Sequence, residues 1–357
     1  MTGREQEVLE AIERRRRRRP RLKDEVVTLA HGAGGKATRT LIEALFLEEF
    51  GNPRLAPLAD AALFDVAGAR FAFTTDSYVV KPLFFPGGDI GELAVNGTVN
   101  DLAVAGARPL FLTAGFIVEE GFPTADLRRV AASVGRAARA AGVEVVAGDT
   151  KVVERGKGDG VYINTSGIGV LEHEHDLSPA SVRPGDKVLV SGTLGDHGIA
   201  VMVARGSLEL EVDLDSDTAP LTELVHGLLS ATPGVRCLRD LTRGGLATAL
   251  NEIADAANVS IVIDEAALPI RPEVNGACEI LGIDPLYVAN EGKLVAIVAP
   301  EALAAAYSAL GSSPLGIDTE IVGEVRADAE GMVFLDTAFG GRRVVDVLVG
   351  DPLPRIC

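Results

Sequence analysis

The stretch IGELAVNGTVNDLAVAGARPLFLTAGFIV, residues 90–118, carries the pattern that decides the fold. Its first part, residues 90–105, has the apolar spacing of a helix, and its second part, residues 110–118, is an apolar run typical of a strand. The alternation continues on both sides, with strands expected over 71–75, 143–146 and 161–170 and a helix over 124–141. The sequence therefore predicts an α/β first domain.

A second α/β domain is expected beyond a turn-rich stretch at residues 178–186. Predicted strands over 187–191, 260–263, 293–298 and 321–325 are interleaved there with predicted helices over 196–205, 220–230, 243–257 and 300–310. A length of 357 residues also fits two domains of ~150 residues each. We place the boundary near residue 177, so that the domains span 24–177 and 178–349.

The beginning of the chain differs from the rest in charge. Residues 1–23 hold nine Arg or Lys against four Glu, whereas the whole chain has a formal net charge of -17. A run of like charges is typical of a solvated, disordered arm, although it could also bind RNA or an acidic partner. The acidic balance of the whole chain argues against a nucleic-acid-binding protein. After this arm, the β-branched run at residues 25–29 predicts the first strand, and a helix is expected from the next loop to Phe50.

Composition also bears on the compartment. The longest apolar window, residues 102–118, is interrupted by Arg108 and Pro109, so no membrane span is expected, and the N-terminus lacks the apolar segment of a secretory signal. The three cysteines, Cys237, Cys278 and Cys357, are widely spaced and form no CxxC pair, which indicates a reducing compartment. We expect a cytoplasmic protein.

The glycine-rich sequence HGAGGK, residues 31–36, resembles a phosphate-binding loop. The Walker pattern fails, because Ala30 stands where it requires Gly and Ala37 where it requires Ser or Thr. Two interpretations stay open: backbone N–H groups that approach an anion, or a tight turn before a helix.

Carboxylates recur where predicted strands run into turns, at Asp76, Asp101 and Asp149. A single acidic residue in such a place is commonly a helix cap or a turn former. Three in one domain favour a site for ATP and magnesium, because Mg²⁺ takes oxygen ligands and bridges phosphates. Lys151, two residues after Asp149, could neutralise a phosphoryl group or could be a solvated lysine.

The second domain has two polar motifs. RDLTRGGL, residues 239–246, places charged residues just before a predicted helix. Glu291, at the entrance to a predicted buried strand, could be a general base if burial raises its pKa, or a surface turn residue.

The last residue of the sequence, Cys357, follows a proline-containing segment. Pro352 and Pro354 favour an extended backbone, and seven residues at ~3.3 Å each reach roughly 20 Å, enough to cross a domain cleft. Residues 350–357 could therefore form a carrier tail that brings a thiol to a distant site. In isolation, a terminal cysteine proves little.

Together these motifs resemble the HypE family of hydrogenase maturation factors. The motifs that carry the resemblance are HGAGG at 31–35, TDS at 75–77, NGTVNDL at 96–102, GDTK at 148–151, DLTRGGL at 240–246, NEG at 290–292 and PRIC at 354–357. The internal motifs are shared with the superfamily of aminoimidazole ribonucleotide synthetase and selenophosphate synthetase, whereas the PRIC ending is specific to HypE. The resemblance runs from about residue 25 to the end.

The resemblance implies a two-domain PurM-like fold, a homodimer whose first-domain sheets pair into a barrel-like core, and an ATP site near the dimer interface. It also implies a reaction in which ATP drives dehydration of a carbamoyl group on Cys357 to a thiocyanate, the source of the cyanide ligand of the nickel-iron hydrogenase centre. The implied partners are the carbamoyltransferase HypF, which loads the tail, and the HypC–HypD complex, which receives the cyanide.

The same resemblance implies roles for individual residues. Glu291 would be the base, Lys151 would polarise the substrate oxygen or the phosphate, and Asp101 would support the site around Cys357. Magnesium would lie near Asp76, Asp101 and Asp149. The residues expected to bind ATP are Gly34, Gly35, Lys36, Asp76, Asn100, Asp149, Thr150, Asp240 and Arg243.

Three rival functions remain at this level. A selenophosphate synthetase-like kinase would need a reactive Cys or selenocysteine near the glycine loop, and no Cys precedes Cys237. A purine-pathway enzyme would have no use for Cys357. An inert scaffold that only presents its tail would show no ATP turnover that depends on Cys357.

Overall fold

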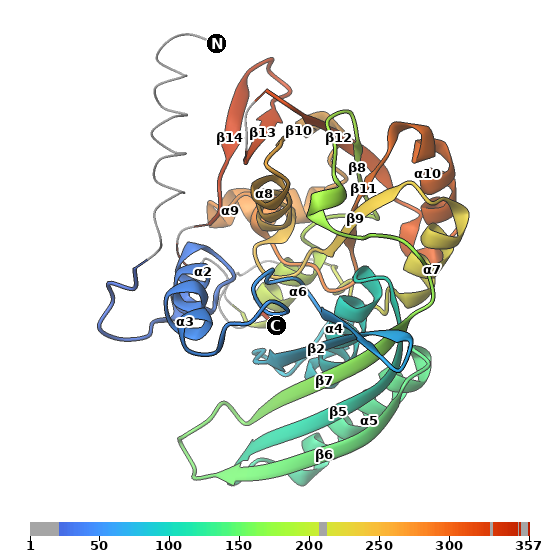
Figure 1. Cartoon of the computed structure of the whole chain (residues 1–357). Helices are drawn as coiled ribbons and strands as arrows, with labels where there is room; N and C mark the ends of the chain where they lie inside the picture. Colours follow the sequence, from blue (N-terminus) through green and yellow to red (C-terminus); the bar gives the residue numbers. More distant parts are fainter. Residues whose placement is uncertain (1–20, 207–212, 329–330, 349, 351–355) are drawn as a thin grey trace.

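Two β-sheets organise the chain (Figure 1). The computed structural model describes residues 21–206, 213–328, 331–348, 350 and 356–357. The predicted basic arm therefore lies outside the described residues, apart from residues 21–23. The sheets occupy residues 62–171 and 187–345, and the boundary near residue 177 stays a prediction.

The first sheet has the strand order β1-β2-β7-β5-β6. Its strands are β1 (Ala62–Val66), β2 (Ala69–Tyr78), β5 (Ala107–Glu119), β6 (Glu144–Val153) and β7 (Val161–Leu171). Neighbouring strands are antiparallel except β5 and β6, which are parallel because the helix α5 (Thr124–Ala140) returns the chain between them. The predicted helix at the start of this pattern is α4 (Ile90–Val104), which follows the short hairpin β3 (Phe84–Phe85) and β4 (Gly88–Asp89).

Among the described residues, helices cover one face of this sheet. Val95 and Val99 of α4 pack with Leu112 of β5 and with Val134 of α5. On the other face, Phe73, Phe111 and Ile117 are between 43% and 47% exposed. The first sheet therefore has a buried face under two helices and an open face with large apolar side chains.

The second sheet has the order β14-β13-β10-β12-β8-β11-β9. Its strands are β8 (Lys187–Val190), β9 (Val235–Asp240), β10 (Ser260–Asp264), β11 (Leu294–Val298), β12 (Glu320–Arg326), β13 (Met332–Asp336) and β14 (Arg342–Val345). Its helices are α6 (Asp196–Ala204), α7 (Thr222–Ala231), α8 (Gly245–Ala257), α9 (Pro272–Leu281) and α10 (Leu303–Gly311). Val188 and Val190 pack toward α8, whereas Leu189 packs toward α7 and α10, so helices bury both faces. The α/β class predicted for both domains is confirmed.

The segment before the first sheet corrects one prediction. Residues 25–29 form no strand, and Val26 and Val27 are 72% and 75% exposed, because this β-branched run pairs with no described strand. The chain instead makes a 3₁₀ turn at Leu29–Gly32. The helix expected as far as Phe50 is present as α2 (Lys36–Leu41), a π-helical segment (Ile42–Phe46) and α3 (Leu47–Phe50).

The two domains meet at a shared apolar cluster. Tyr78, Val80 and Ile90 of the first domain pack with Ile199 and Val288 of the second. Ile356 belongs to the same cluster, so the end of the chain lies between the domains, where Figure 1 marks the C-terminus. No described helix combines the length and the apolar composition needed to span a bilayer.

Candidate active site

A cavity of about 290 Å³ lies between the domains, next to the buried chain end. Five carboxyl groups line it, together with the Arg243 guanidinium and Cys357. Each domain supplies part of this set, because Asp60, Asp76 and Asp101 come from the first domain and Asp240 and Glu291 from the second. The cavity is therefore an acidic site that exists only where the domains meet.

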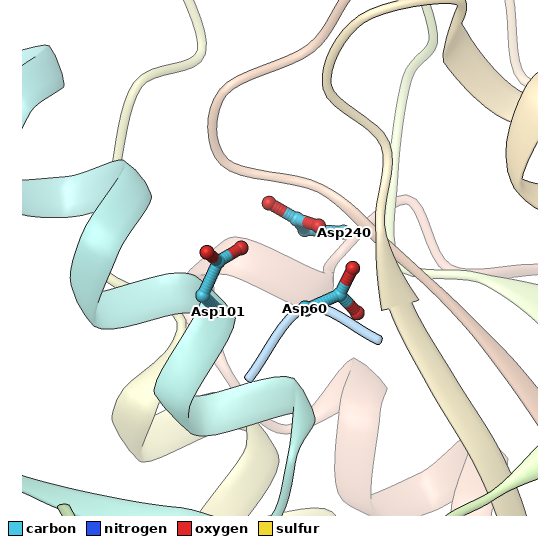
Figure 2. A group of neighbouring side chains, drawn as sticks. All are labelled: Asp60, Asp101 and Asp240. Carbon is cyan, nitrogen blue, oxygen red and sulfur yellow. The ribbon is translucent and has the colours of Figure 1, made fainter. Parts of the chain in front are cut away.

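Three of these carboxyl groups form a compact cluster (Figure 2). Oxygen atoms of Asp60, Asp101 and Asp240 all lie within 4.8 Å of one another. Asp101 lies on α4, Asp240 ends β9, and Asp60 lies just before β1. The Thr74 hydroxyl is 2.7 Å from the Asp60 main-chain oxygen and 2.8 Å from Oδ2 of Asp101. Arg239 forms an ion pair with Asp60, which fixes that carboxylate at the rim.

Burial raises the pKa of all three aspartates, and their mutual repulsion raises those of Asp101 and Asp240 further. Such a cluster is unfavourable when fully ionised unless a cation compensates the charge. Oxygen ligands with a high local negative charge are those that Mg²⁺ prefers. The donor set therefore fits magnesium, which Asp60, Asp101 and Asp240 could hold.

Glu291 reaches the same cavity from the loop before β11. Its side chain is 3% exposed, and its Oε1 atom has no hydrogen-bond partner among the described residues. Burial raises the pKa of Glu291 well above its usual range, with further contributions from Asp240 and Asp217. A buried carboxylate with an unused oxygen and a raised pKa is suited to accept a proton near neutral pH.

The loop that carries Glu291 is fixed by its main chain. The Glu291 N–H donates to Oδ1 of Asp217 at 2.9 Å, and its carbonyl accepts from Nδ2 of Asn100 at 3.2 Å. A Cβ atom on Gly292 would lie 1.9 Å from the Asp217 main-chain oxygen, so only glycine allows this close approach. The NEG motif therefore positions the Glu291 carboxylate, and its glycine allows close packing against the Asp217 main chain.

Cys357 closes the cavity from the side of the tail. The Cys357 main-chain oxygen accepts a hydrogen bond from the Val79 N–H at 3.2 Å, and the Ile356 side chain is 5% exposed. A second cavity, of about 450 Å³, also borders Cys357, beside Arg243 and Tyr162. The charge at Cys357 is the largest cause that raises the pKa of Arg243. The chain end is thus docked against the acidic cavity.

Comparisons with known proteins identify the family. Residues 58–171 match the AIR synthase related protein N-terminal domain, and residues 183–336 match the corresponding C-terminal domain. Carbamoyl dehydratase HypE of Rhodobacter capsulatus is 57% identical over 339 residues, which cover 94% of this chain and 99% of that protein.

This chain belongs to the carbamoyl dehydratase HypE family.

Further relatives and solved structures agree. Carbamoyl dehydratase HypE of Escherichia coli is 48% identical, over 93% of this chain and 99% of that protein. A crystal structure of hydrogenase maturation protein HypE in complex with ATP has 47% identity and a TM-score of 0.78, over 93% of this chain and 100% of that chain. HypE in a HypE–HypF complex has 49% identity and a TM-score of 0.82, over 86% and 99%. The resemblance seen in the motifs is confirmed.

In this HypE family member the glycine loop packs against the second domain. Gly34 has φ +77°, and a Cβ atom there would lie 3.0 Å from Cβ of Arg243. A Cβ atom on Gly35 would lie 2.5 Å from the Leu348 main-chain oxygen. Lys36 pairs with Asp346 at 2.9 Å, outside the acidic cavity. Gly34 lines a neighbouring cavity of about 420 Å³ together with Asp240 and Arg243.

The GDTK motif lies away from the acidic cavity within one chain. Asp149, Thr150 and Lys151 are exposed on β6, the edge strand, where Lys151 pairs with Asp149 at 2.8 Å. In the sheet register, Asp149 of β6 lies opposite Gly115 of β5, which lies opposite Asn164 of β7, which lies opposite Ser77 of β2. Ser77 lines the cavity, so three strand spacings, about 14 Å, separate the Asp149 backbone from the cavity wall. The single chain therefore brings together Asp76, Asp101, Asp240, Arg243, Glu291 and Cys357, but leaves the GDTK residues apart.

Sequence reasoning missed two residues at the site. Asp60 lies in the sequence LADAAL, which has no motif character, and tertiary contacts with Arg239 and Thr74 place it in the cluster. The Tyr78 hydroxyl lies 3.3 Å from Oδ2 of Asp76, and a Cβ atom on Gly97 would lie 2.1 Å from that hydroxyl. Gly97 in the NGTVNDL motif therefore makes room for Tyr78.

Proposed function

We propose that this HypE family chain uses ATP to dehydrate a carbamoyl group on the Cys357 sulfur. The observation that carries the proposal is the docked chain end, because Cys357 and Glu291 border the same cavity. The product is a thiocyanate on Cys357, which supplies the cyanide ligand of the nickel-iron hydrogenase centre.

The chemistry explains why a nucleotide and a base are both needed. The oxygen of a thiocarbamate, R–S–C(=O)–NH₂, is a poor leaving group until it is phosphorylated. Transfer of the γ-phosphoryl group from ATP and loss of one N–H proton give a phosphorylated imidate. Loss of the second N–H proton then expels inorganic phosphate and forms R–S–C≡N. The carbamoyl oxygen leaves in phosphate, and two protons must be accepted.

Glu291 is the group that we assign to accept these protons. It is buried, its Oε1 is unused, and its raised pKa favours proton uptake near neutral pH. Arg243, beside Cys357 and the aspartates, would hold the negative charge of the phosphoryl group in place. Asp101 acts with Asp60 and Asp240 as a magnesium ligand, and Asp76 orients Tyr78 at the wall.

ATP and magnesium are proposed on different grounds. A solved HypE relative was crystallised in complex with ATP, and we extend that ligand to this chain. Magnesium, when bound, would neutralise phosphate charge next to the substrate. The three clustered aspartates support this assignment, because their charges need a cation.

A homodimer would give the GDTK motif a role in the active site. All of β6 except Val153 is exposed, and unpaired edge strands with apolar side chains on an open face favour association. We propose that the open faces of two first domains pair into a barrel-like core. Asp149, Thr150 and Lys151 of one chain then contribute to the ATP site of its partner, where Lys151 polarises the phosphate or the carbamoyl oxygen.

The remaining proposals concern partners and place. A relative forms a HypE–HypF complex, and we propose that the carbamoyltransferase HypF loads Cys357 here as well. The HypC–HypD complex is the proposed acceptor of the cyanide. A carrier thiol requires a reducing compartment, which supports a cytoplasmic location.

Intact mass spectrometry tests the proposal directly. The chain is incubated with HypF, carbamoyl phosphate and ATP, and we expect a carbamoyl adduct on Cys357 that then loses one water. In Glu291→Gln we expect loading at the normal rate and conversion slowed about 10²- to 10⁴-fold, because the base is gone. Glu279→Gln, an exposed glutamate on α9, is the matched control.

Two outcomes would contradict the assignment. An adduct that never loses water in the wild-type chain would leave only a scaffold that presents its tail. Normal conversion in Glu291→Gln would remove Glu291 as the base while the overall reaction stood.

A further inference from the structure

A buried histidine contacts the docked end of the chain. His197 lies in the first turn of α6 and is 0% exposed. Its Nε2 atom is 2.7 Å from the Ile356 carbonyl oxygen, and its Nδ1 atom is 2.8 Å from the Ser216 hydroxyl oxygen. Both ring nitrogens are therefore used, and one of them reaches the residue before the carrier cysteine.

The direction of these bonds can be derived. A carbonyl oxygen only accepts, so the Nε2 atom of His197 must carry the hydrogen. Burial lowers the pKa of His197, which favours the neutral ring, and Nδ1 then accepts from the Ser216 hydroxyl. The Ser216 oxygen in turn accepts from the Thr218 N–H at 3.2 Å. The result is a directed chain of hydrogen bonds from Thr218 to Ile356.

Ile356 and Cys357, at the end of the tail, accept hydrogen bonds from both domains. His197 holds the Ile356 carbonyl from the second domain, and the Val79 N–H holds the Cys357 main-chain oxygen from the first. The Ile356 side chain fills the apolar cluster between the domains, and the Phe85 ring contacts His197 edge-on at 5.6 Å between centroids. The apolar contact alone would allow the tail to slide or turn, whereas the hydrogen bond to a carbonyl fixes its register.

We propose that His197 is the positioning residue that holds the docked tail, so that the sulfur of Cys357 lies at the acidic cavity. The inference deepens the proposed function, since it concerns how the carrier reaches that site. His197 does not touch the reacting atoms. It sets the fraction of time that Cys357 spends in the site.

The test measures docking without any chemistry at the carbamoyl group. A maleimide attached to a large polyethylene glycol is too bulky to enter the site, so its rate of reaction with Cys357 reports the undocked fraction. In His197→Phe, which keeps a ring of similar size, we expect labelling about tenfold faster, the factor that corresponds to one lost buried hydrogen bond of about 1.4 kcal/mol. His197→Gln retains an N–H donor and should restore part of the slow labelling.

Controls separate positioning from a general loss of structure. Ser216→Ala leaves the tail contact in place but removes the partner of Nδ1, and we expect a smaller acceleration. His226→Phe replaces an exposed histidine of α7 and should label like the wild type. Near-UV circular dichroism checks that each variant is folded. If His197→Phe does not fold, His197→Gln and Ser216→Ala give the answer.

Conversion of the loaded tail provides a second readout. In a folded His197→Phe chain we expect a lower turnover number with an unchanged KM for ATP, because the nucleotide site is intact and only the tail is misplaced. Wild-type labelling rates in the folded variants would overturn the proposal whatever the enzymatic result. Faster labelling of His197→Phe, together with a wild-type chain that never dehydrates the adduct, would uphold the tail contact and contradict the proposed function.

Discussion

At the scale of single residues, the acidic cluster shows how function can oppose stability. Burial raises the pKa values of Asp60, Asp101 and Asp240, and repulsion between neighbouring carboxylates raises those of Asp101 and Asp240 further. A carboxyl group whose pKa is higher in the folded chain than in the unfolded chain binds its proton more tightly when folded. The free energy of unfolding therefore falls as the pH rises above the ordinary aspartate pKa of about 3.9.

The same charges predict a pH-dependent response to magnesium. Because the pKa values of Asp101 and Asp240 are raised, protons compete with Mg²⁺ for these carboxylates, and the ion should bind more tightly at about pH 8 than at about pH 6. We expect a larger rise in Tm on addition of Mg²⁺ at the higher pH, equivalent to about 2.7 kcal/mol when the free ion is at 100 times its Kd. Thermal unfolding with and without the ion measures this. Asp101→Asn should abolish most of the rise, whereas Asp318→Asn, an exposed aspartate, should keep it. An equal response at both pH values would contradict the cluster as the ligand set.

Residue motifs predicted part of this site and could not predict the rest. Glu291, Asp101 and Cys357 were expected from their motifs, and the structure brings them to one cavity. Asp60 was not expected, because its place depends on an ion pair with Arg239, which lies 179 residues later. The burial that raises the pKa of Glu291 is likewise a property of the tertiary structure.

At the scale of elements, the helix α4 is hydrogen-bonded to the second domain through the side-chain amides of Asn96 and Asn100, and Asn100 makes most of these bonds. Nδ2 of Asn100 donates to the main-chain oxygens of Ala219 and Glu291 at 3.0 and 3.2 Å, and its Oδ1 accepts from the Leu221 N–H at 2.7 Å. Asn100 was expected to bind ATP. Its buried side chain instead has every described bond directed at the second domain, so a positioning role fits the geometry better.

This role predicts a stability defect. Asn100→Ala removes three hydrogen bonds, two of them fully buried, so we expect the free energy of unfolding to fall by about 2–4 kcal/mol. Urea unfolding measures the loss, and Asn275→Ala, an exposed asparagine of α9, serves as the comparison. Unchanged stability together with a lost affinity for ATP would show that Asn100 is a nucleotide ligand after all.

A strand predicted from an apolar run formed where a neighbouring strand could pair with it. The run at residues 110–118 became strand β5, which is paired on both sides by β7 and β6, whereas the run at 25–29 became no strand, because no described neighbour pairs with it. Strand β9 was not expected, although it ends at Asp240. Its short sequence, VRCLRD, contains two arginines and an aspartate and was not recognised as a strand, and pairing with β11 makes it one.

At the scale of the whole molecule, the docked chain end and the first sheet contribute different groups to the proposed active site. Ile356 is held inside one molecule, between its domains, and Cys357 lines the cavity that Glu291 also lines. Lys151 is not among the residues that line that cavity and is exposed on an edge strand. A site that needs both groups is incomplete in a single chain, and this makes the proposed dimer testable through function.

Mixed dimers provide that test. Lys151→Ala and Glu291→Gln should each be inactive as pure proteins, with conversion of the loaded tail lowered about 10²-fold or more. If Lys151 acts on the tail of the partner, unfolding and refolding the two variants together should restore about one quarter of the wild-type activity. Half of the randomly assembled dimers are then mixed, and each has one complete site, in which the Lys151→Ala chain supplies Glu291 and its partner supplies Lys151. The control is the double variant Lys151→Ala, Glu291→Gln mixed with wild type. If Lys151 acts on the partner chain, the mixed dimers of this control have no complete site. If Lys151 acts on its own chain, each of these mixed dimers has one complete site. No recovery in the first mixture, with active mixed dimers in the second, would show that Lys151 serves its own chain.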